Sequence, residues 1–276
     1  MHWAPAGLGW LEAVTWVGLA PCSGQSSISM SACAALREGI AGCTQAGSTR
    51  CSFMSGIQRR NQIFVLGLPK TGTSSLHEAL LGAGVRSCHS SGFSNPLQFA
   101  SGAYLGTLDP LNTTLVTLCS ALGDVPWYAL ALLLLHSQPH ARFILTRHER
   151  GCGEWVEHMR GLDAWASQHP RAARWEEHHV RDFHECFFGG RAITEQTKPR
   201  YVQRCEDHEK NVMSMAHALG RRLLVLPVEW PDAAKWEAVI RFIAPSPSAR
   251  VRQRLDVLNG SKWPYARSSP SLHLQK

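Results

Sequence analysis

The sequence lacks the common signatures of a metal site or a disulfide scaffold. None of its nine cysteines forms a Cys-x-x-Cys pair, and no His-Glu-x-x-His run occurs. Because the cysteines are odd in number and widely scattered, their spacing predicts neither bound zinc nor a disulfide framework, and it favours a reducing compartment. His178, His179 and His184 gather beside Glu185 without a metalloprotease spacing, so we expect no metal.

A clean membrane-spanning run is also missing. Residues 3–22 are apolar, but Pro5, Glu12 and Pro21 interrupt them, and no Lys or Arg precedes them. A spanning helix needs about 20 cleaner apolar residues, and a signal peptide usually begins with positive charge. We therefore expect no membrane span.

Acidic residues are scarce in the rest of the N-terminal segment. Residues 22–60 are rich in Ser, Gly, Cys and Ala and carry four arginines against one acid, Glu38. A transit peptide, a disordered extension and a start codon placed too early all fit this composition. We expect residues 1–60 to lie outside the fold, with a cytoplasmic location preferred and organellar or secretory targeting through this segment left open.

The remaining composition is that of a globular chain that prefers anionic partners. With 44% hydrophobic and 18% charged residues among 276, disorder, collagen and coiled coil are excluded. Lys and Arg number 28 against 21 Asp and Glu, and this net charge of +7 is compatible with nucleic acid, a phosphorylated cofactor or an acidic glycan. Trp155, Trp165 and Trp175 are more typical of packing than of a nucleic-acid stacking platform, so we expect no nucleic-acid partner.

Apolar patterns divide the chain after Asn61 into alternating strands and helices. Residues 63–66 form a continuous apolar run ending at Gly67, which is typical of a strand buried on both faces. Further elements are expected as a helix ending near Ala83, a strand at 85–88, a helix at 127–135, and strands at 142–146 and 223–228. This alternation predicts a three-layer, P-loop-like α/β domain over residues 61–245, with a mostly parallel sheet flanked by helices. Residues 246–276 form a basic C-terminal tail.

The loop after the first strand has the features of an anion site. A Gly-rich turn between a buried strand and a helix aims backbone N–H groups and the helix dipole at one point outside the sheet. Gly67 to Gly72 has the G-x-x-x-x-G spacing of a phosphate loop, but Thr73 stands where a nucleotide triphosphatase needs Lys, and the lysine lies at position 70. A plain Gly/Pro turn with a solvated lysine is the structural alternative.

The run FVLGLPKTGTSSL resembles the 5′-phosphosulfate loop of sulfotransferases that use 3′-phosphoadenosine 5′-phosphosulfate, whose signature is Pro-Lys-x-Gly-Thr-Thr/Ser after a strand. Later segments are similar to the P-loop branch of that superfamily in order and spacing. They are Asp124-x-Pro126, the strand RFILTR ending at Arg147, the helix from Tyr201 with His208 and Asn211, and RRLLVLPV. The resemblance covers roughly residues 61–245, the span of one domain.

This resemblance implies roles for the loop. Backbone amides from Thr71 to Ser75 would hold the 5′-phosphosulfate of the co-substrate, and the hydroxyls of Thr73, Ser74 and Ser75 would add donors. Lys70 would bind beside the bridging oxygen and stabilise the charge that gathers on the departing phosphate during in-line transfer. No metal is required for this chemistry. The implied cofactor-binding residues are therefore Lys70, Thr71, Gly72, Thr73, Ser74, Ser75 and Arg147.

An attacking hydroxyl or amine loses a proton, so a general base is expected near the sulfuryl group. Asp124 is the candidate, although many cytosolic relatives have His-x-Pro in the comparable place, and an Asp at a helix start often serves as an N-cap. His89, at the end of the second strand, is the alternative base.

Arg147 ends a strand at the edge where open α/β sheets bind ligands. In the family, this Arg and a Ser eight residues later bind the 3′-phosphate, but Trp155 occupies the eighth position here. If HERGCG holds three extra residues, His158 takes the Ser position, and Arg150 or Arg160 could compensate. A surface salt bridge is the structural alternative for Arg147.

The function expected from the resemblance is a sulfotransferase that acts on a small-molecule or glycan acceptor, with Lys70 and Asp124 as catalytic residues. The stretch from Asp163 to Arg200 is expected on the acceptor side. Two alternatives stay open: a P-loop small-molecule kinase or nucleotide hydrolase, and a phosphate-binding relative without turnover, motivated by the missing Ser. The acceptor and the oligomeric state are not predicted by the sequence.

Overall fold

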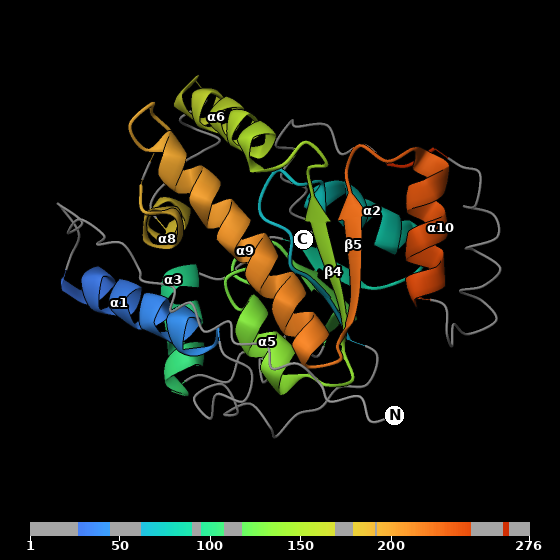
Figure 1. Ribbon diagram of the computed structural model, residues 1–276, viewed down its shortest axis with the longest axis horizontal. Helices are drawn as coiled ribbons and strands as arrows, with labels where there is room; N and C mark the ends of the chain where they lie inside the picture. The colour runs from blue at the N-terminus through green and yellow to red at the C-terminus, as the bar shows by residue number, and fades with distance from the viewer. Residues whose placement is uncertain are drawn as a thin grey trace, which may run out of the picture.

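The computed structural model describes residues 27–44, 62–89, 95–107, 118–168, 179–190, 192–243 and 262–264. Its strands are β1 (Ile63–Val65), β2 (Ser87–His89), β3 (Ala121–Gly123), β4 (Arg142–Arg147) and β5 (Arg222–Pro227). Its helices are α1 (Ser27–Gly42), α2 (Thr73–Gly82), α3 (Pro96–Leu105), α5 (Ala131–Ser137), α6 (Cys152–Gln168), α8 (His179–Phe188), α9 (Lys198–Ala218) and α10 (Asp232–Ile243) (Figure 1).

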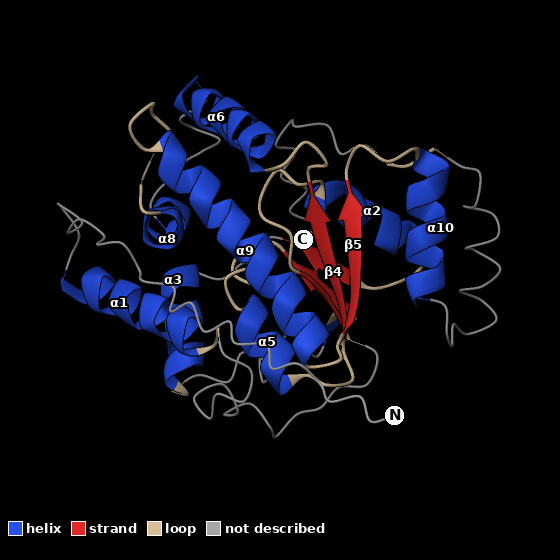
Figure 2. Ribbon diagram, in the orientation of Figure 1, coloured by secondary structure: helices blue, strands red, loops and turns tan. Residues whose placement is uncertain are grey.

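The described strands form one sheet in the order β2-β3-β1-β4-β5. Ile63 of β1 lies opposite Ala121 of β3 and Arg142 of β4. Each described pairing is parallel, so the carboxyl ends of these strands meet at one edge. Figure 2 shows the sheet between α2 and α10 on one side and α5 and α9 on the other. The predicted three-layer α/β fold with a mostly parallel sheet is confirmed.

Alternate residues of β1, together with Leu66, which follows it, contribute to the cores on the two faces of the sheet. Phe64 and Leu66 belong to the core that includes α5 and α9, whereas Ile63 and Val65 belong to the core that includes α2 and α10. Because neighbouring side chains of a strand point to opposite faces, a strand covered on both faces must be apolar at every position. This requirement explains the continuous apolar run at 63–66.

The predicted strands agree with the observed ones to within two residues at each end. β3 spans only the three residues Ala121–Gly123, which carry no periodic pattern, and it ends directly before Asp124. The helix expected at 127–135 is observed as α5, which begins later. Hydrogen-bonded turns precede it, with the Trp127 amide donating to the Asp124 carbonyl at 2.7 Å.

Helix α1 corrects the expectation that the whole of residues 1–60 lies outside the fold. It packs against α3 and α8. Leu36 is fully buried, and Arg37 Nε donates to the Cys186 carbonyl at 3.0 Å. The expectation is therefore wrong for residues 27–44, while residues 1–26 and 45–60 lie outside the described part of the chain.

The predicted basic tail also includes a packed residue. Trp263 is 3% exposed, and its ring centroid lies 4.8 Å from that of Trp236 in α10. Apart from residues 262–264, the tail lies outside the described residues. The division into segments at residues 61 and 245 stays a prediction.

Three disulfides whose partners both lie among the described residues correct the expectation that the cysteines form no framework. They join Cys33 to Cys186, Cys88 to Cys119 and Cys152 to Cys205, with Cα separations of 5.4, 5.9 and 5.7 Å. The partners are 153, 31 and 53 residues apart in sequence. Spacing along the chain could not reveal them, because only the folding of distant elements brings them together.

Among the described helices, none is both long enough and apolar enough to cross a membrane.

We expect peptide mapping without reduction to recover all three cross-links. Replacing Cys33 and Cys186 together by Ser should lower the free energy of unfolding by about 2–4 kcal/mol, because the unfolded chain loses a long closed loop. Denaturant unfolding of the variant and the parent measures this difference. Free thiols at all six positions in the freshly purified, folded protein would contradict the assignment.

Candidate active site

A tight loop of residues 66–72 joins β1 to α2 at the carboxyl edge of the sheet. Its backbone is left-handed at Lys70, with φ 64°, and at Gly72, with φ 82°. Glycine adopts this conformation freely, whereas a lysine does so only when its surroundings enforce it. At Gly67 a Cβ atom would collide with Thr146 of β4. The loop therefore needs glycine at 67 for close packing and at 72 for the turn.

Side chains from distant elements hold the carbonyl groups of this loop. The donors are His208 of α9, Trp155 of α6 and His148, which follows β4. The hydrogen bonds run from His208 Nε2 to the Leu66 carbonyl at 2.8 Å, from Trp155 Nε1 to the Pro69 carbonyl at 2.6 Å, and from His148 Nε2 to the Lys70 carbonyl at 2.9 Å.

Burial keeps one of these donors neutral. It lowers the pKa of His208 to about 4, although the hydrogen bond to the Leu66 carbonyl opposes the shift. The ring is therefore uncharged near pH 7, and a donor to a carbonyl must carry its proton on Nε2. Trp155 is 1% exposed, so its hydrogen bond is shielded from water.

Thr71 closes the loop from within. Its amide donates to the Leu68 carbonyl at 3.2 Å, and its hydroxyl donates to the same carbonyl at 2.6 Å. The hydroxyl also lies 2.7 Å from Thr146 Oγ1. Both donors of Thr71 are thus engaged inside the protein.

Backbone amides of the loop remain available to a ligand. The amides of Lys70, Gly72, Thr73 and Ser74 have no acceptor among the described residues, and no side chain caps the N-terminus of α2. The first bond of the helix runs from the Leu76 amide to the Gly72 carbonyl at 3.0 Å. Unpaired N–H groups at a helix N-terminus bear the positive end of the helix dipole. This arrangement fits an anion.

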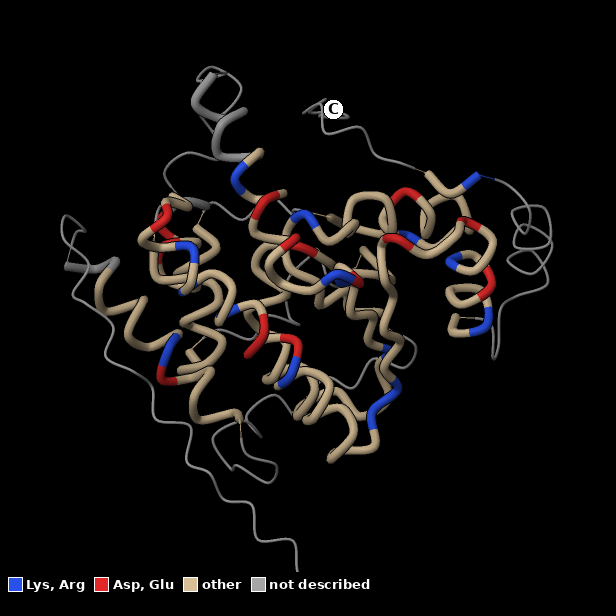
Figure 3. The backbone as a smooth tube through the Cα atoms, turned by 45° about the horizontal axis from the view of Figure 1, so that its top comes forward, with Lys and Arg blue, Asp and Glu red and all other residues tan. Residues whose placement is uncertain are grey.

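The Lys70 ammonium adds a positive charge at this place. Among the described residues it makes no ion pair, and its side chain is partly exposed. Lys and Arg are otherwise interspersed with Asp and Glu along the described elements (Figure 3). The Lys70 ammonium therefore adds its charge to the positive end of the α2 dipole at this loop.

His89 and Asp124 meet beside the start of α2. His89 Nε2 lies 3.1 Å from Thr73 Oγ1 and 3.6 Å from Asp124 Oδ2. The backbone of Asp124 is left-handed, with φ 68°, and its buried Oδ1 has no hydrogen-bond partner among the described residues. The two residues that the sequence offered as alternative bases are thus neighbours, and Asp124 keeps an unpaired oxygen.

Other polar groups lie near this pair. His77 Nδ1 is 2.9 Å from Ser87 Oγ, and burial, together with the charge of His89, lowers the pKa of His77 to about 4. Burial lowers the pKa of His184 in α8 to about 4, an effect that Asp124 opposes. His184 Nε2 and Tyr128 Oη are buried without partners within the described part of the chain.

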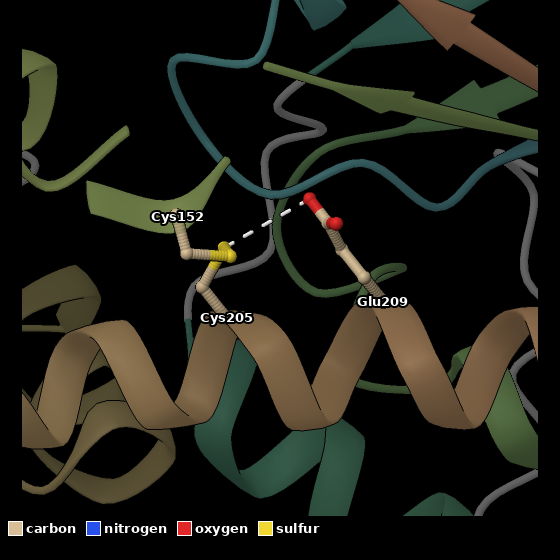
Figure 4. A group of neighbouring side chains, drawn as sticks. All are labelled: Cys152, Cys205 and Glu209. Atoms are coloured by element: carbon tan, nitrogen blue, oxygen red, sulfur yellow. Dashed lines mark hydrogen bonds between the residues drawn. A yellow bond between two sulfur atoms is a disulfide. The ribbon is translucent and has the colours of Figure 1, made fainter. Parts of the chain in front are cut away.

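Arg147, at the end of β4, forms an ion pair with Glu209 of α9. Arg147 Nη2 lies 3.2 Å from Glu209 Oε2. Burial raises the pKa of Glu209, while the charges of Arg147 and His148 oppose the shift. Figure 4 shows the Cys152–Cys205 disulfide beside this carboxylate, with Cys205 Sγ 3.9 Å from Glu209 Oε1. The two sulfur atoms are bonded to each other, so they are not the thiolates that a metal ion would need.

The structure brings most of the predicted site residues together. Lys70 and the segment from Thr71 to Ser75 form the loop and the start of α2, and Asp124 reaches them through His89. Arg147 is connected to the loop through its neighbour His148, which bonds the Lys70 carbonyl.

Sequence reasoning missed the residues that hold the loop. Trp155 was interpreted as packing, and His208 as part of a motif without a stated contact. His148 and Glu209 gave no signal, because their partners lie 78 and 62 residues away (148 − 70 and 209 − 147). His178 lies outside the described residues, and the described His184 and Glu185 belong to no cluster with metal-ligand geometry.

A family model described as "Sulfotransferase domain" matches residues 62–250 of the chain. This is 189 residues (250 − 62 + 1), more than half of the 276. The resemblance drawn from the loop and the later segments is thereby confirmed at the level of the superfamily. No curated protein matches the chain.

Proposed function

Because the chain belongs to the sulfotransferase domain family, we propose that it transfers a sulfuryl group from 3′-phosphoadenosine 5′-phosphosulfate to a hydroxyl or amine acceptor. The observation that supports this most is the loop after β1. Its carbonyls are held by His208, Trp155 and His148, while the amides of Lys70, Gly72, Thr73 and Ser74 have no acceptor among the described residues. A sulfonated phosphate is an anion with acceptor oxygens, which is what such a loop binds.

The donor nucleotide is proposed to bind with its 5′-phosphosulfate at the start of α2. The free amides of Gly72, Thr73 and Ser74 supply hydrogen bonds, and Ser75 completes the proposed cradle. Thr71 is part of the cradle only through the shape that it gives the loop, because its amide and hydroxyl both bond the Leu68 carbonyl. No metal ligand is needed, since the amides and Lys70 supply the compensating positive charge.

Lys70 is proposed to act on the leaving group. In-line transfer breaks the bond between sulfur and the bridging oxygen, so negative charge accumulates on the departing phosphate. The left-handed backbone of Lys70 is fixed by the hydrogen bond between its carbonyl and His148. An ammonium held there stabilises the transition state more than the ground state, which makes its role catalytic rather than only one of binding.

Asp124 is proposed as the general base, with His89 as its positioning partner. The Oδ2 atom of Asp124 faces His89, which also contacts Thr73 and Ser74 at the start of α2, so the carboxylate lies beside the proposed place of transfer. Its Oδ1 atom is left to accept the acceptor's proton. The acceptor side is proposed to include α8, which carries His184 in the field of Asp124.

An oxidising compartment is proposed for the folded protein. Three disulfides join its elements, and such bonds persist where the glutathione system does not reduce them. This proposal replaces the cytoplasmic preference that the spacing of the cysteines suggested. Peptide mapping without reduction tests this proposal, because free thiols at these cysteines would contradict an oxidising compartment.

Calorimetric titration with two nucleotides tests the proposed function. We expect adenosine 3′,5′-bisphosphate to bind more tightly than ATP with magnesium, because Thr73 stands where a triphosphatase loop has its lysine. Preferential binding of ATP with magnesium would favour a kinase or hydrolase instead. Bisphosphate binding without sulfuryl transfer to any acceptor of a broad panel would favour a relative without turnover.

Lys70→Ala should lower sulfuryl transfer by roughly 10²–10³-fold, the scale for removing one group that stabilises transition-state charge. Affinity for adenosine 3′,5′-bisphosphate should change much less, because the backbone amides remain. Lys210→Ala, which removes an exposed lysine of α9, is the matched control and should retain transfer. A Lys70→Ala protein with unchanged turnover would exclude Lys70 from catalysis.

Asp124→Asn should reduce kcat by roughly 10²–10⁴-fold, because an amide cannot accept the acceptor's proton. His89→Gln should have a smaller effect, since it removes only a neighbour of the carboxylate. Both variants should bind adenosine 3′,5′-bisphosphate as the parent does. If His89→Gln shows the larger loss of kcat, the base is His89 and the assignment to Asp124 is wrong.

A further inference from the structure

The sequence resemblance implies that Arg147 binds the nucleotide's 3′-phosphate, and in the structure Arg147 forms an ion pair with Glu209. Arg147 Nη2 and Glu209 Oε2 are 3.2 Å apart, and the side chains are 27% and 10% exposed. Both groups are therefore largely withdrawn from water, where a charge pair is screened less than at the surface. The guanidinium that a phosphate would need is already paired.

The charge of Arg147, and after it that of His148, stabilises the Glu209 carboxylate. Within the described part of the chain, Arg147 is the only residue that forms an ion pair with the Glu209 carboxylate. The other carboxylate oxygen faces Cys205 Sγ at 3.9 Å, and this sulfur is bonded to Cys152, so it has no proton to donate. If Arg147 binds another anion instead, this largely buried carboxylate loses most of the positive charge that stabilises it.

Two anions cannot use the same guanidinium without cost. A phosphate recognised by an arginine takes its parallel N–H donors. With Glu209 ionised, the pair with Arg147 has no net charge, so an arriving phosphate meets a neutral pair and a nearby like charge. The carboxylate must move away or lose its charge before the phosphate gains the full benefit of Arg147.

We propose that Glu209 is a specificity-determining residue that competes with the 3′-phosphate of the donor nucleotide for Arg147. The parent chain then discriminates weakly between adenosine nucleotides with and without a 3′-phosphate. This inference rests on the proposed function, since it assumes that the nucleotide's 5′ group is bound at the loop and its 3′-phosphate at Arg147. It concerns a different contact, because Glu209 belongs to α9 and its partner ends β4.

Titration with adenosine 3′,5′-bisphosphate and adenosine 5′-monophosphate tests the proposal. Both nucleotides carry the 5′-phosphate, so the ratio of their dissociation constants isolates the 3′-phosphate. Glu209→Gln should raise the preference for the bisphosphate roughly tenfold, the scale of one close charge pair. Affinity for the monophosphate should stay unchanged. Glu237→Gln, which removes an exposed carboxylate of α10 that has no contact with Glu209 or Arg147 among the described residues, is the matched control and should leave the ratio unchanged.

A second substitution assigns the effect to Arg147. In an Arg147→Ala background, Glu209→Gln should no longer raise the ratio, because the group for which the two anions compete is gone. If Glu209→Gln does not fold, Glu209→Asp is used instead. It shortens the side chain by one methylene, which moves the carboxylate away from Arg147, and it should still raise the preference for the bisphosphate over the monophosphate. An unchanged or lower ratio in the folded variant overturns the role of Glu209 while leaving the proposed function intact. Failure of both nucleotides to bind the parent protein overturns both proposals.

Discussion

The orientation of the peptide groups in the loop after β1 is the constraint on which the site depends. A trans peptide unit points its C=O and N–H in opposite directions. The hydrogen bond from Trp155 to the Pro69 carbonyl therefore turns the Lys70 amide away from Trp155, and this amide has no acceptor among the described residues. Side chains thus hold the carbonyl groups of the loop, and its unpaired amides are left to the proposed anion.

The residues that hold the loop come from separate elements, so the site exists only in the complete fold. Trp155 lies on α6 and His208 on α9, and the Cys152–Cys205 disulfide joins these two helices close to both contacts. Each hydrogen bond contributes only about 1 kcal/mol to stability. Their combined effect is positional: they fix a backbone that is left-handed at Lys70. Preorganisation of this kind lets dipoles stabilise charge without rearranging during the reaction.

The parts of the fold that depend on local pattern could be predicted from the sequence. The apolar run at 63–66 requires a strand covered on both faces, and Gly67 and Gly72 follow from the turn that leads into α2. Parallel strands then bring Asp124 and Arg147 to the same edge as the loop. These inferences need only the spacing of residues along the chain.

The rest depends on contacts between distant residues, which no local pattern encodes. Cys33 and Cys186 are 153 residues apart, so the cysteine spacing gave no sign of the disulfide that fixes α1 to α8. Glu209 looks like any polar residue on a helix until α9 places it against Arg147. The role of His208 could not be predicted for the same reason. It is buried and neutral, and it donates a hydrogen bond to the loop, which the sequence alone does not show.

The most direct test of the account is an amide ¹H–¹⁵N correlation spectrum recorded during titration with adenosine 3′,5′-bisphosphate. The largest shifts are predicted at the amides of Gly72, Thr73 and Ser74, because these N–H groups gain an acceptor. The amide of Thr71 should shift less, since it already donates to the Leu68 carbonyl. Saturating binding that leaves the amides of residues 72–74 unshifted would contradict the central claim.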